Sequence, residues 1–254
     1  MGRLPILNIT PTVEAGRWPA KAIVGEVIPF SAVVFREGHD ALGVELLLTA
    51  PDGSQTTHRM NAGAPGSDRW HTAVQLGVQG AYRFQIRAFS DEFETWHHNT
   101  EVKLAVGVDE ELMMLEGIRV LTRAAADKAR PKANAKHLVE AAEILGDKAR
   151  SAQSRFEAAN ADALVKAIAA EPIRELVTLS DEFVINCERQ YAGAAAWYEF
   201  FPRSEGAKFD AKAKTWASGT FKTATKRLPA VAAMGFDVLY MPPIHPIGHS
   251  HRKG

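Results

Sequence analysis

GFDVLYMPPIHPIGHSHRKG, residues 235–254, joins a short apolar run to a polar loop. The run Phe236–Met241 is rich in strand-forming residues, which is typical of a strand buried on both faces of a parallel sheet. Prolines at 242, 243 and 246 prevent both ladder pairing and helix formation, so the strand must end in an irregular loop. That loop carries the polar residues His245, His249, His251, Arg252 and Lys253.

An alanine-rich helical pattern precedes this strand, and a second aromatic run, AWYEFFPRS (Ala196–Ser204), precedes the helix. Thr220 is a suitable N-cap, Pro229 starts a second helical piece or kinks the first, and Gly235 provides a left-handed end. The polar segment 204–216 is predicted to be the loop between strand and helix. Strand, helix and strand form one βα unit plus the next strand, and barrel folds keep their chemistry at the carboxyl ends of such strands.

Two of these segments carry a resemblance to a known family. WYEFFPRS (197–204) and LPAVAAMGFDVLYMPPIHPIG (228–248) resemble the start of the catalytic barrel in the α-1,4-glucan:maltose-1-phosphate maltosyltransferases. These are bacterial members of the α-amylase superfamily, glycoside hydrolase family 13. GRWPAKAIVGEVIPFSAVVFREGHD (16–40) resembles the amino-terminal domain of the same family. The resemblance spans nearly the whole chain but only the amino-terminal part of such an enzyme, which continues through most of a (β/α)₈ barrel and a further β-domain.

The resemblance implies a retaining maltosyl transfer from maltose 1-phosphate to an α-1,4-glucan acceptor, with release of phosphate. A retaining mechanism needs two carboxyl groups about 5 Å apart. In the family the aspartate nucleophile and the glutamate acid/base lie beyond the position of Gly254, so we expect no catalytic residue in this chain. Lys253 is the candidate for contacting the donor, because lysine meets a phosphate as a point charge. The family also implies a homodimer, and it implies no cofactor.

We therefore expect a truncated, catalytically incompetent amino-terminal portion of a maltosyltransferase. A barrel with two of its eight strands cannot close, and it leaves apolar edges and faces exposed. The alternative is a finished non-catalytic module that dimerises or binds glucan. The coding sequence after Gly254 distinguishes the two, because only a longer enzyme continues in frame toward a catalytic aspartate.

Composition excludes several classes of partner. Thirty basic and thirty acidic side chains cancel, which argues against a general nucleic-acid or acidic-membrane surface. Cys187 is the lone cysteine, so a reducing compartment fits best. The amino terminus lacks a signal-peptide pattern, and no apolar run approaches the about 18 residues of a membrane span. We expect a cytoplasmic protein with neither nucleic acid nor membrane as a partner.

Residues 1–107 are predicted to form an immunoglobulin-like β-sandwich. Turns rich in glycine, proline and aspartate separate short strand-like runs, and the clearest run, 81–88, alternates apolar and polar residues with period two. The expected strands are 6–9, 27–35, 44–49, 55–60, 70–76, 81–88 and 101–106.

Residues 108–182 are predicted to form a small α-helical insert domain. The period changes at Asp109, where clustered carboxylates favour a helix start, and further helices are expected near Asn134 and over 162–170. Pro172 is expected to open a short helical turn. Residues 183–254 then begin with a strand over 183–186 and form the start of the catalytic barrel. The predicted fold class is multidomain α+β, with a sandwich, a helical domain and the first βαβ portion of an incomplete (β/α)₈ TIM barrel.

Three groups of residues admit a functional and a structural interpretation. Histidines 245, 249 and 251 suggest zinc, but their loop lacks a carboxylate or thiol, so contact with sugar is preferred. Glu199 invites a catalytic role, but an ion pair with Arg203 is preferred. Aromatic residues of the amino-terminal region suggest a sugar-stacking platform, but a core role for Trp70 and interface roles for the others are preferred. These aromatic residues are Trp18, Trp70, Trp96, His97 and His98.

Overall fold

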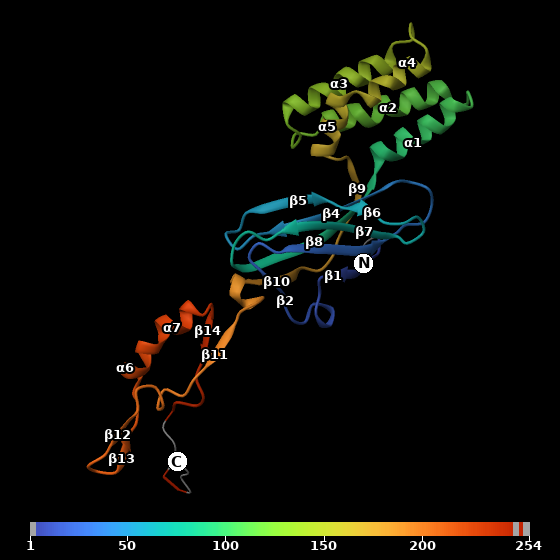
Figure 1. Cartoon of the computed structure of the whole chain (residues 1–254). Helices are drawn as coiled ribbons and strands as arrows, with labels where there is room; N and C mark the ends of the chain where they lie inside the picture. The colour runs from blue at the N-terminus through green and yellow to red at the C-terminus, as the bar shows by residue number, and fades with distance from the viewer. Residues whose placement is uncertain (1–3, 246–248, 251–254) are drawn as a thin grey trace.

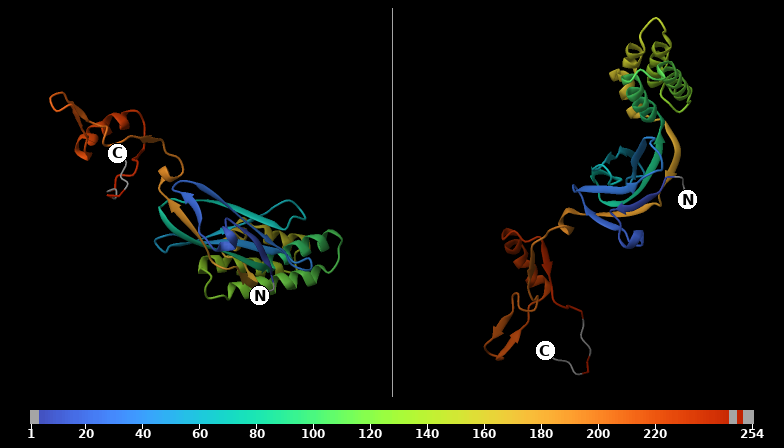
Figure 2. Two further views of the ribbon diagram at one scale, coloured as in Figure 1. Left: turned by 90° about the horizontal axis from the view of Figure 1, so that it is seen from below. Right: turned by 90° about the vertical axis from the view of Figure 1, so that its right-hand side faces the viewer.

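The computed structural model describes residues 4–245 and 249–250 and shows three bodies in a row (Figures 1 and 2). The two-sheet body (residues 4–91 and 174–188) lies in the middle. The helical body (residues 92–173) lies at one end, and the C-terminal body (residues 196–245) lies at the other. The fold thus mixes helices with several sheets.

Two sheets build the central body. The first has the antiparallel order β1 (Ile6–Thr10), β3 (Val27–Val34), β7 (Arg69–Gln75) and β6 (Asn61–Ala62). The second has the order β2 (Ala20–Ile23), β10 (Phe183–Glu188), β8 (Gly80–Asp91), β4 (Leu42–Thr49) and β5 (Gln55–Arg59). Strand β9 (Arg174–Leu179) also pairs with β8, and a short 3₁₀ turn, η1 (Glu14–Gly16), precedes β2.

One hydrophobic core lies between the two sheets. On β8 the predicted alternation is confirmed, since Tyr82, Phe84 and Ile86 are buried while Arg83 is exposed. The ring of Phe84 meets the ring of Phe30 on β3 edge to face, with centroids 5.1 Å apart. Burial of the alternate residues therefore fixes which face of each sheet points inward.

The helical body has a core of its own. It consists of α1 (Glu92–Ala105), α2 (Glu110–Ala125), α3 (Lys132–Gly146), α4 (Ala152–Phe156), η2 (Glu157–Asn160) and α5 (Asp162–Ala170). Trp96, Leu121 and Leu138 are buried in one cluster between these helices. Gly117 of α2 is required there, because a Cβ at this position would overlap the Trp96 ring.

Two secondary-structure predictions are wrong. The strand expected over 101–106 is instead the last part of helix α1. This helix begins after its N-cap Asp91, and the Asp91 carboxylate accepts the N–H of Glu94 at 3.2 Å. Burial of Phe93, Trp96 and Thr100 on one face, at helical spacing, outweighs the strand preference of the later valines. The helical turn expected after residue 172 is instead strand β9. This segment forms a strand because its backbone pairs with β8 in antiparallel orientation.

The C-terminal body contains the predicted strand–helix–strand unit. Strands β11 (Trp197–Glu199) and β14 (Val238–Tyr240) are parallel neighbours, and between them lie α6 (Phe221–Ala224), η4 (Thr225–Arg227) and α7 (Leu228–Ala233). Thr220 and Thr223 form a capping box, and Pro229 lies in the first turn of α7. Gly235 has a φ of 85°, the left-handed helix end that was predicted.

The loop predicted over 204–216 contains an antiparallel hairpin, β12 (Lys208–Asp210) and β13 (Thr215–Ala217), that the sequence pattern did not indicate. The strand expected over 183–186 is β10, which pairs with β8 and β2 of the two-sheet body and leads through η3 (Gln190–Ala192) to β11. The ranges 1–107, 108–182 and 183–254, taken as domain limits, stay a prediction.

Every helix within the described residues is too short or too polar to cross a membrane.

Candidate functional site

The carboxyl ends of β11 and β14 meet at one edge of the C-terminal body, which we call the carboxyl edge. Glu199 lies opposite Tyr240 in the parallel register, and the N–H of Phe200 donates to the C=O of Tyr240 at 3.4 Å. Beyond this point the chain leaves the sheet twice, first as segment 201–207 and later as the proline loop that starts at Met241. The two loops predicted to follow the strands therefore share one edge.

The opposite end of the strand pair is fixed by Asp237. Its carboxylate accepts the N–H of Ala196 at 2.9 Å, and its own N–H donates to the C=O of Ala196 at 2.9 Å. The Tyr198 ring packs against Phe236 with centroids 5.0 Å apart, and its hydroxyl accepts from Arg227 at 3.2 Å. This hydrogen bond raises the pKa of Arg227, so the cation that ties η4 to β11 stays charged.

Segment 201–207 is held against the start of α6. The N–H of Gly219 donates to the C=O of Arg203 at 2.7 Å, and the hydroxyl of Thr223 donates to the C=O of Glu205 at 2.7 Å. A Cβ at Gly219 would overlap the carbonyl oxygen of Glu205, so only glycine permits this approach. The βα loop is therefore an ordered platform at the carboxyl edge.

Glu199, the carboxylate considered for catalysis, is exposed at the end of β11. Within residues 4–245 and 249–250 no ion pair includes it, so the predicted pair with Arg203 is wrong. In the turn after β11 the N–H of Ser204 donates to the C=O of Phe201 at 2.9 Å, and the C=O of Arg203 accepts the N–H of Gly219.

The loop after β14 carries the other predicted site residues. His245 and His249 are both exposed. Lys253, the predicted donor contact, lies outside the described residues, as do His251 and Arg252. Over the part of the chain that the structure describes, no three His, Cys, Asp or Glu side chains gather closely enough to hold a metal ion.

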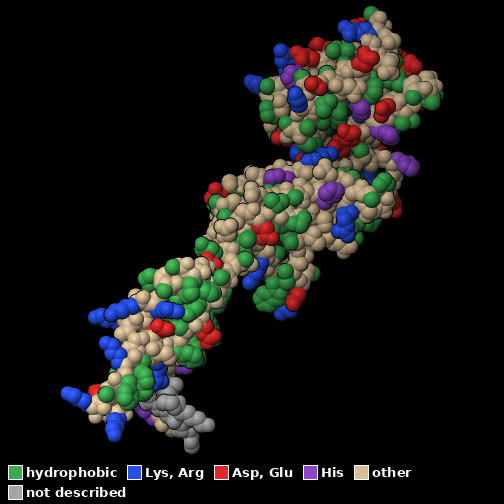
Figure 3. Space-filling view, in the orientation of Figure 1, with side chains coloured by type: hydrophobic (Ala, Val, Ile, Leu, Met, Phe, Trp, Pro, Cys, Tyr) green, Lys and Arg blue, Asp and Glu red, His purple; other side chains and the backbone are tan. Residues whose placement is uncertain are grey.

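Large apolar side chains are exposed on the C-terminal body (Figure 3). Trp197 on β11 is 62% exposed and Tyr240 on β14 is 47% exposed. Isolated exposed apolar residues are common, but a group of this size on one small body marks a surface that binds another part of a protein or a ligand. Further members of the group are Phe201, Leu228, Met234 and Ile244.

The aromatic residues considered as a sugar platform lie in different places. Trp70 packs against the two-sheet core and donates to the C=O of Val34 at 3.2 Å, as predicted for a core residue. Trp96 is buried in the helical core and donates to the C=O of Met113 at 2.8 Å, so its predicted interface role is wrong. Trp18 is exposed on the loop before β2. These three tryptophans form no common platform.

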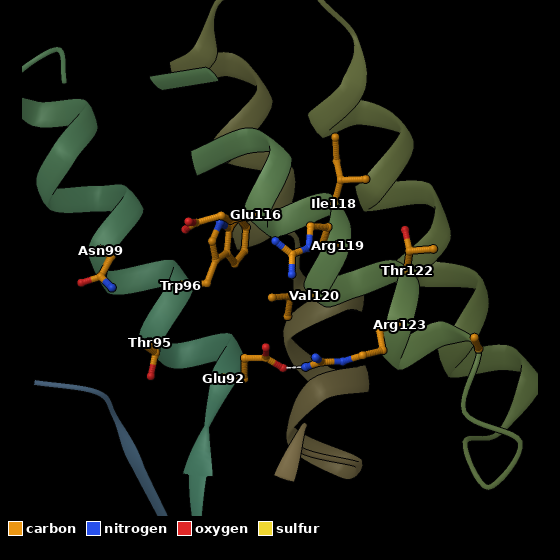
Figure 4. Close-up of a pocket in the computed structure, with 11 residues that line it drawn as sticks. Glu92, Thr95, Trp96, Asn99, Glu116, Ile118, Arg119, Val120, Thr122 and Arg123 are labelled. Carbon is orange, nitrogen blue, oxygen red and sulfur yellow. Dashed lines mark ion pairs between the residues drawn. The ribbon is translucent and has the colours of Figure 1, made fainter. Parts of the chain in front are cut away.

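A groove of about 680 Å³ runs between α1 and α2 (Figure 4). Glu92 of α1 and Arg123 of α2 form an ion pair across it, and Arg123 also reaches Glu175 at 3.3 Å. Asn99 and Arg119 add polar groups farther along the groove. The Glu92–Arg123 pair therefore ties the two helices together across the groove.

A buried carboxylate that sequence reasoning missed lies where the helical body joins the two-sheet body. Glu45 of β4 is only 2% exposed and accepts from Arg87 of β8 at 2.7 Å and from Arg174 of β9 at 2.9 Å. Burial raises the pKa of Glu45, but hydrogen bonds and charge from Arg174 and then Arg87 outweigh this effect and lower it. Glu45 is therefore ionised and links three strands.

The sequence of the chain is similar to a family of known proteins. Residues 2–189 match the family model described as α-1,4-glucan:maltose-1-phosphate maltosyltransferase, domain N/S. Over its whole length the chain is 45% and 44% identical to α-1,4-glucan:maltose-1-phosphate maltosyltransferases 1 and 2 of Streptomyces coelicolor. It is 35% identical to the Mycobacterium tuberculosis enzyme of that name.

These alignments cover 100% of the chain, but only 37% of each Streptomyces protein and 39% of the Mycobacterium protein. The chain thus spans well under half the length of the curated relatives that it matches. The family match covers the two-sheet body and the helical body, and the longer alignments extend through the C-terminal body. The chain therefore belongs to the α-1,4-glucan:maltose-1-phosphate maltosyltransferase family and corresponds to an amino-terminal part of its members.

Proposed function

We propose that this chain is part of a glycosyltransferase that moves maltosyl units from maltose 1-phosphate to α-1,4-glucan. The observation that carries the proposal is the match over the whole chain to relatives named for this reaction. In a retaining transfer, a carboxylate displaces phosphate from the maltosyl group. A 4-hydroxyl of the glucan then attacks the maltosyl-enzyme, gives its proton to a general base and releases the carboxylate.

The C-terminal body supports the part of the proposal that concerns the fold. We propose that β11, the helices after it and β14 begin a (β/α)₈ barrel, and that the two-sheet body is an immunoglobulin-like sandwich. Parallel strands joined through helices are the repeating unit of such a barrel. The exposed Trp197 and Tyr240 would then be covered by further strands and helices.

The proposed active site lies at the carboxyl edge. Barrel enzymes place their catalytic groups there, and both loops of the edge are polar. Lys253, in the loop that starts at Met241, is proposed to contact the phosphate of the donor. The nucleophile and the acid/base are proposed to come from the part of the relatives that this chain does not match, so the chain alone transfers no maltose.

A homodimer in the cytoplasm is the proposed state of the protein. The helical body presents an apolar surface where α1 ends and α2 begins: Leu112 and Leu115 are exposed and share one face of α2, and the exposed Val108 lies just before the helix. Val106 in the same region is 70% exposed. Light scattering after size exclusion should give twice the chain mass. A double variant with Leu112→Glu and Leu115→Glu should elute as a monomer, and a dimeric double variant would place the interface elsewhere.

The transferase proposal is tested by phosphate release from maltose 1-phosphate with a maltooligosaccharide acceptor. The 254-residue chain is compared with a version that continues through its own reading frame to the length of the relatives. Phosphate release by the longer version alone is the expected result. Release by the 254-residue chain would overturn the proposed division of the active site, and release by neither would overturn the proposed reaction.

A further inference from the structure

The β12–β13 hairpin presents two aromatic rings to solvent. Phe209 is 53% exposed and Trp216 is 70% exposed. They lie directly opposite each other in the antiparallel register, with ring centroids 5.5 Å apart and ring planes inclined by 54°. The hairpin belongs to neither of the two hydrophobic core clusters of the described chain. Within the described chain both rings therefore face solvent.

The strand residues on the aromatic face of this hairpin are uncharged. Side chains alternate along a strand, so Phe209 and Trp216 share one face, while Lys208 and Asp210 point to the other. Proteins that stack nucleic-acid bases combine aromatic rings with cations along the same groove. Here Lys208 lies on the opposite face, and Lys212 and Lys214 lie in the turn between the strands, so the two rings themselves present an uncharged surface that suits a neutral ligand.

We propose that Phe209 and Trp216 form a binding platform for α-1,4-glucan, next to the site where the chain is extended. The CH groups on a pyranose face carry partial positive charge, and they pack on the negative face of an aromatic ring. Successive glucosyl units turn relative to one another, so two inclined rings match such a chain better than two coplanar rings. Hydroxyl groups at the rim of the sugar stay in water.

The position of the hairpin connects this platform with the carboxyl edge. The hairpin follows segment 201–207, which leaves β11 at that edge, and precedes α6. Figure 1 shows the hairpin at the end of the C-terminal body that points away from the two-sheet body. A glucan held on the platform would therefore keep its end close to the proposed transfer site. This functional role rests on the proposed transferase activity, whereas binding of glucan to the hairpin does not.

A purely structural role makes a different prediction. Cross-strand aromatic pairs stabilise hairpins, and a pair that did only this would affect stability without affecting glucan affinity. The test is affinity electrophoresis of the folded 254-residue chain in gels that contain increasing amounts of soluble amylose, without maltose 1-phosphate. A non-binding reference protein corrects for the viscosity of the gel. Thermal melts of each variant establish that it is folded.

Trp216→Ala should bind amylose at least about fivefold more weakly than the wild type, as expected for the loss of one stacking partner. Trp216→Phe should retain most of the affinity. Trp18→Ala is the matched control, because Trp18 is 54% exposed but lies on a different body. This variant should bind amylose as tightly as the wild type. Binding should persist from about 0.05 M to about 0.5 M salt, since no charged contact is involved.

The proposed glucan-binding platform would be refuted if amylose retarded the wild type and Trp216→Ala equally, or if it did not retard the wild type. Loss of binding at high salt would instead indicate that the hairpin contacts an anionic polymer. The transferase proposal and the platform proposal can be refuted independently, because the electrophoresis contains no maltose 1-phosphate and measures glucan binding alone. A longer chain that releases phosphate while the hairpin shows no affinity would leave the transferase proposal intact and refute the platform alone.

Discussion

Glu45→Gln should destabilise the protein far more than the loss of an ordinary surface carboxylate. The substitution keeps the shape of the side chain but removes the charge that faces Arg87 and Arg174. Both arginine side chains are only about one-fifth exposed, at 22% and 20%, so water solvates their guanidinium groups poorly, and of the two only Arg174 keeps another carboxylate, that of Glu171 at 3.3 Å. Breaking one partner of a buried pair costs about 3–5 kcal/mol, and the partial exposure of the arginines favours the lower value, about 3 kcal/mol.

Thermal denaturation followed by circular dichroism measures this effect. For a chain of this size, 1 kcal/mol corresponds to about 2–4 °C, so the midpoint should fall by about 6–12 °C. Glu182→Gln is the matched control, because Glu182 pairs with Arg83 at 2.7 Å but both side chains are half exposed. Its loss should cost less than about 1 kcal/mol. Equal midpoints for the two variants would refute the buried-pair reasoning.

The effect of Glu45→Gln should also depend on pH. The pKa of Glu45 in the folded protein lies below its ordinary value of 4.5, so folding favours the charged form. The stabilisation is fully present above pH 4.5 and is lost as the pH falls through the folded pKa. The midpoint difference between wild type and Glu45→Gln should therefore be constant near neutral pH and narrow below pH 4.5. A difference that widens in acid would contradict this assignment.

Three further predictions concern single sites. Gly117→Ala should lower stability by about 1–3 kcal/mol in chemical denaturation because the new methyl overlaps Trp96, whereas Gly146→Ala, with no atom closer than 3.7 Å, should not. Thr220→Ala should remove a helix cap worth about 1 kcal/mol and speed amide hydrogen exchange at the start of α6. The Cys187 thiol is 2% exposed and burial raises its pKa, so it should react with a disulfide reagent only after unfolding.

Sequence reasoning succeeded where local chemistry decides the structure. The alternation over 81–88 predicted a half-buried strand, and the structure buries those alternate residues. The cap at Thr220, the new helical piece or kink at Pro229 and the left-handed Gly235 were each predicted from one residue type, and Pro229 lies in the first turn of α7. The prolines after β14 predicted the end of that strand. In each case the signal and its effect lie within a few residues of each other.

The same reasoning failed where distant segments decide the structure. Strand β9 forms because Arg87 and its neighbours on β8 pair with Leu179 and the residues before it, a contact that no local pattern indicates. The hairpin of Phe209 and Trp216 escaped notice because strands of three residues are too short to show alternation. Glu45 lies 42 residues from Arg87 and 129 residues from Arg174, so charge pairing between them was invisible in the sequence.

The buried charges explain why the helical body can be inserted without loosening the sheet. The chain leaves the two-sheet body after Asp91 and returns at Arg174, and these two residues face each other in the β8–β9 register. Arg59 pairs with Asp91 at 2.9 Å, and Arg174 pairs with Glu45 at 2.9 Å.

The Phe89 ring links these two ion pairs. The guanidinium groups of Arg59 and Arg174 lie 5.2 Å and 5.5 Å from its centroid, so one aromatic ring contacts both arginines. The exit and the return of the chain are thus held by one connected cluster. Because the cluster spans β4, β5, β8 and β9, moving β9 away from β8 and β4 would break several charged contacts together. The cluster therefore holds together the strands of the second sheet at which the chain leaves for the helical body and returns from it, and Glu45 and Asp91 are its two equally buried carboxylates, each 2% exposed.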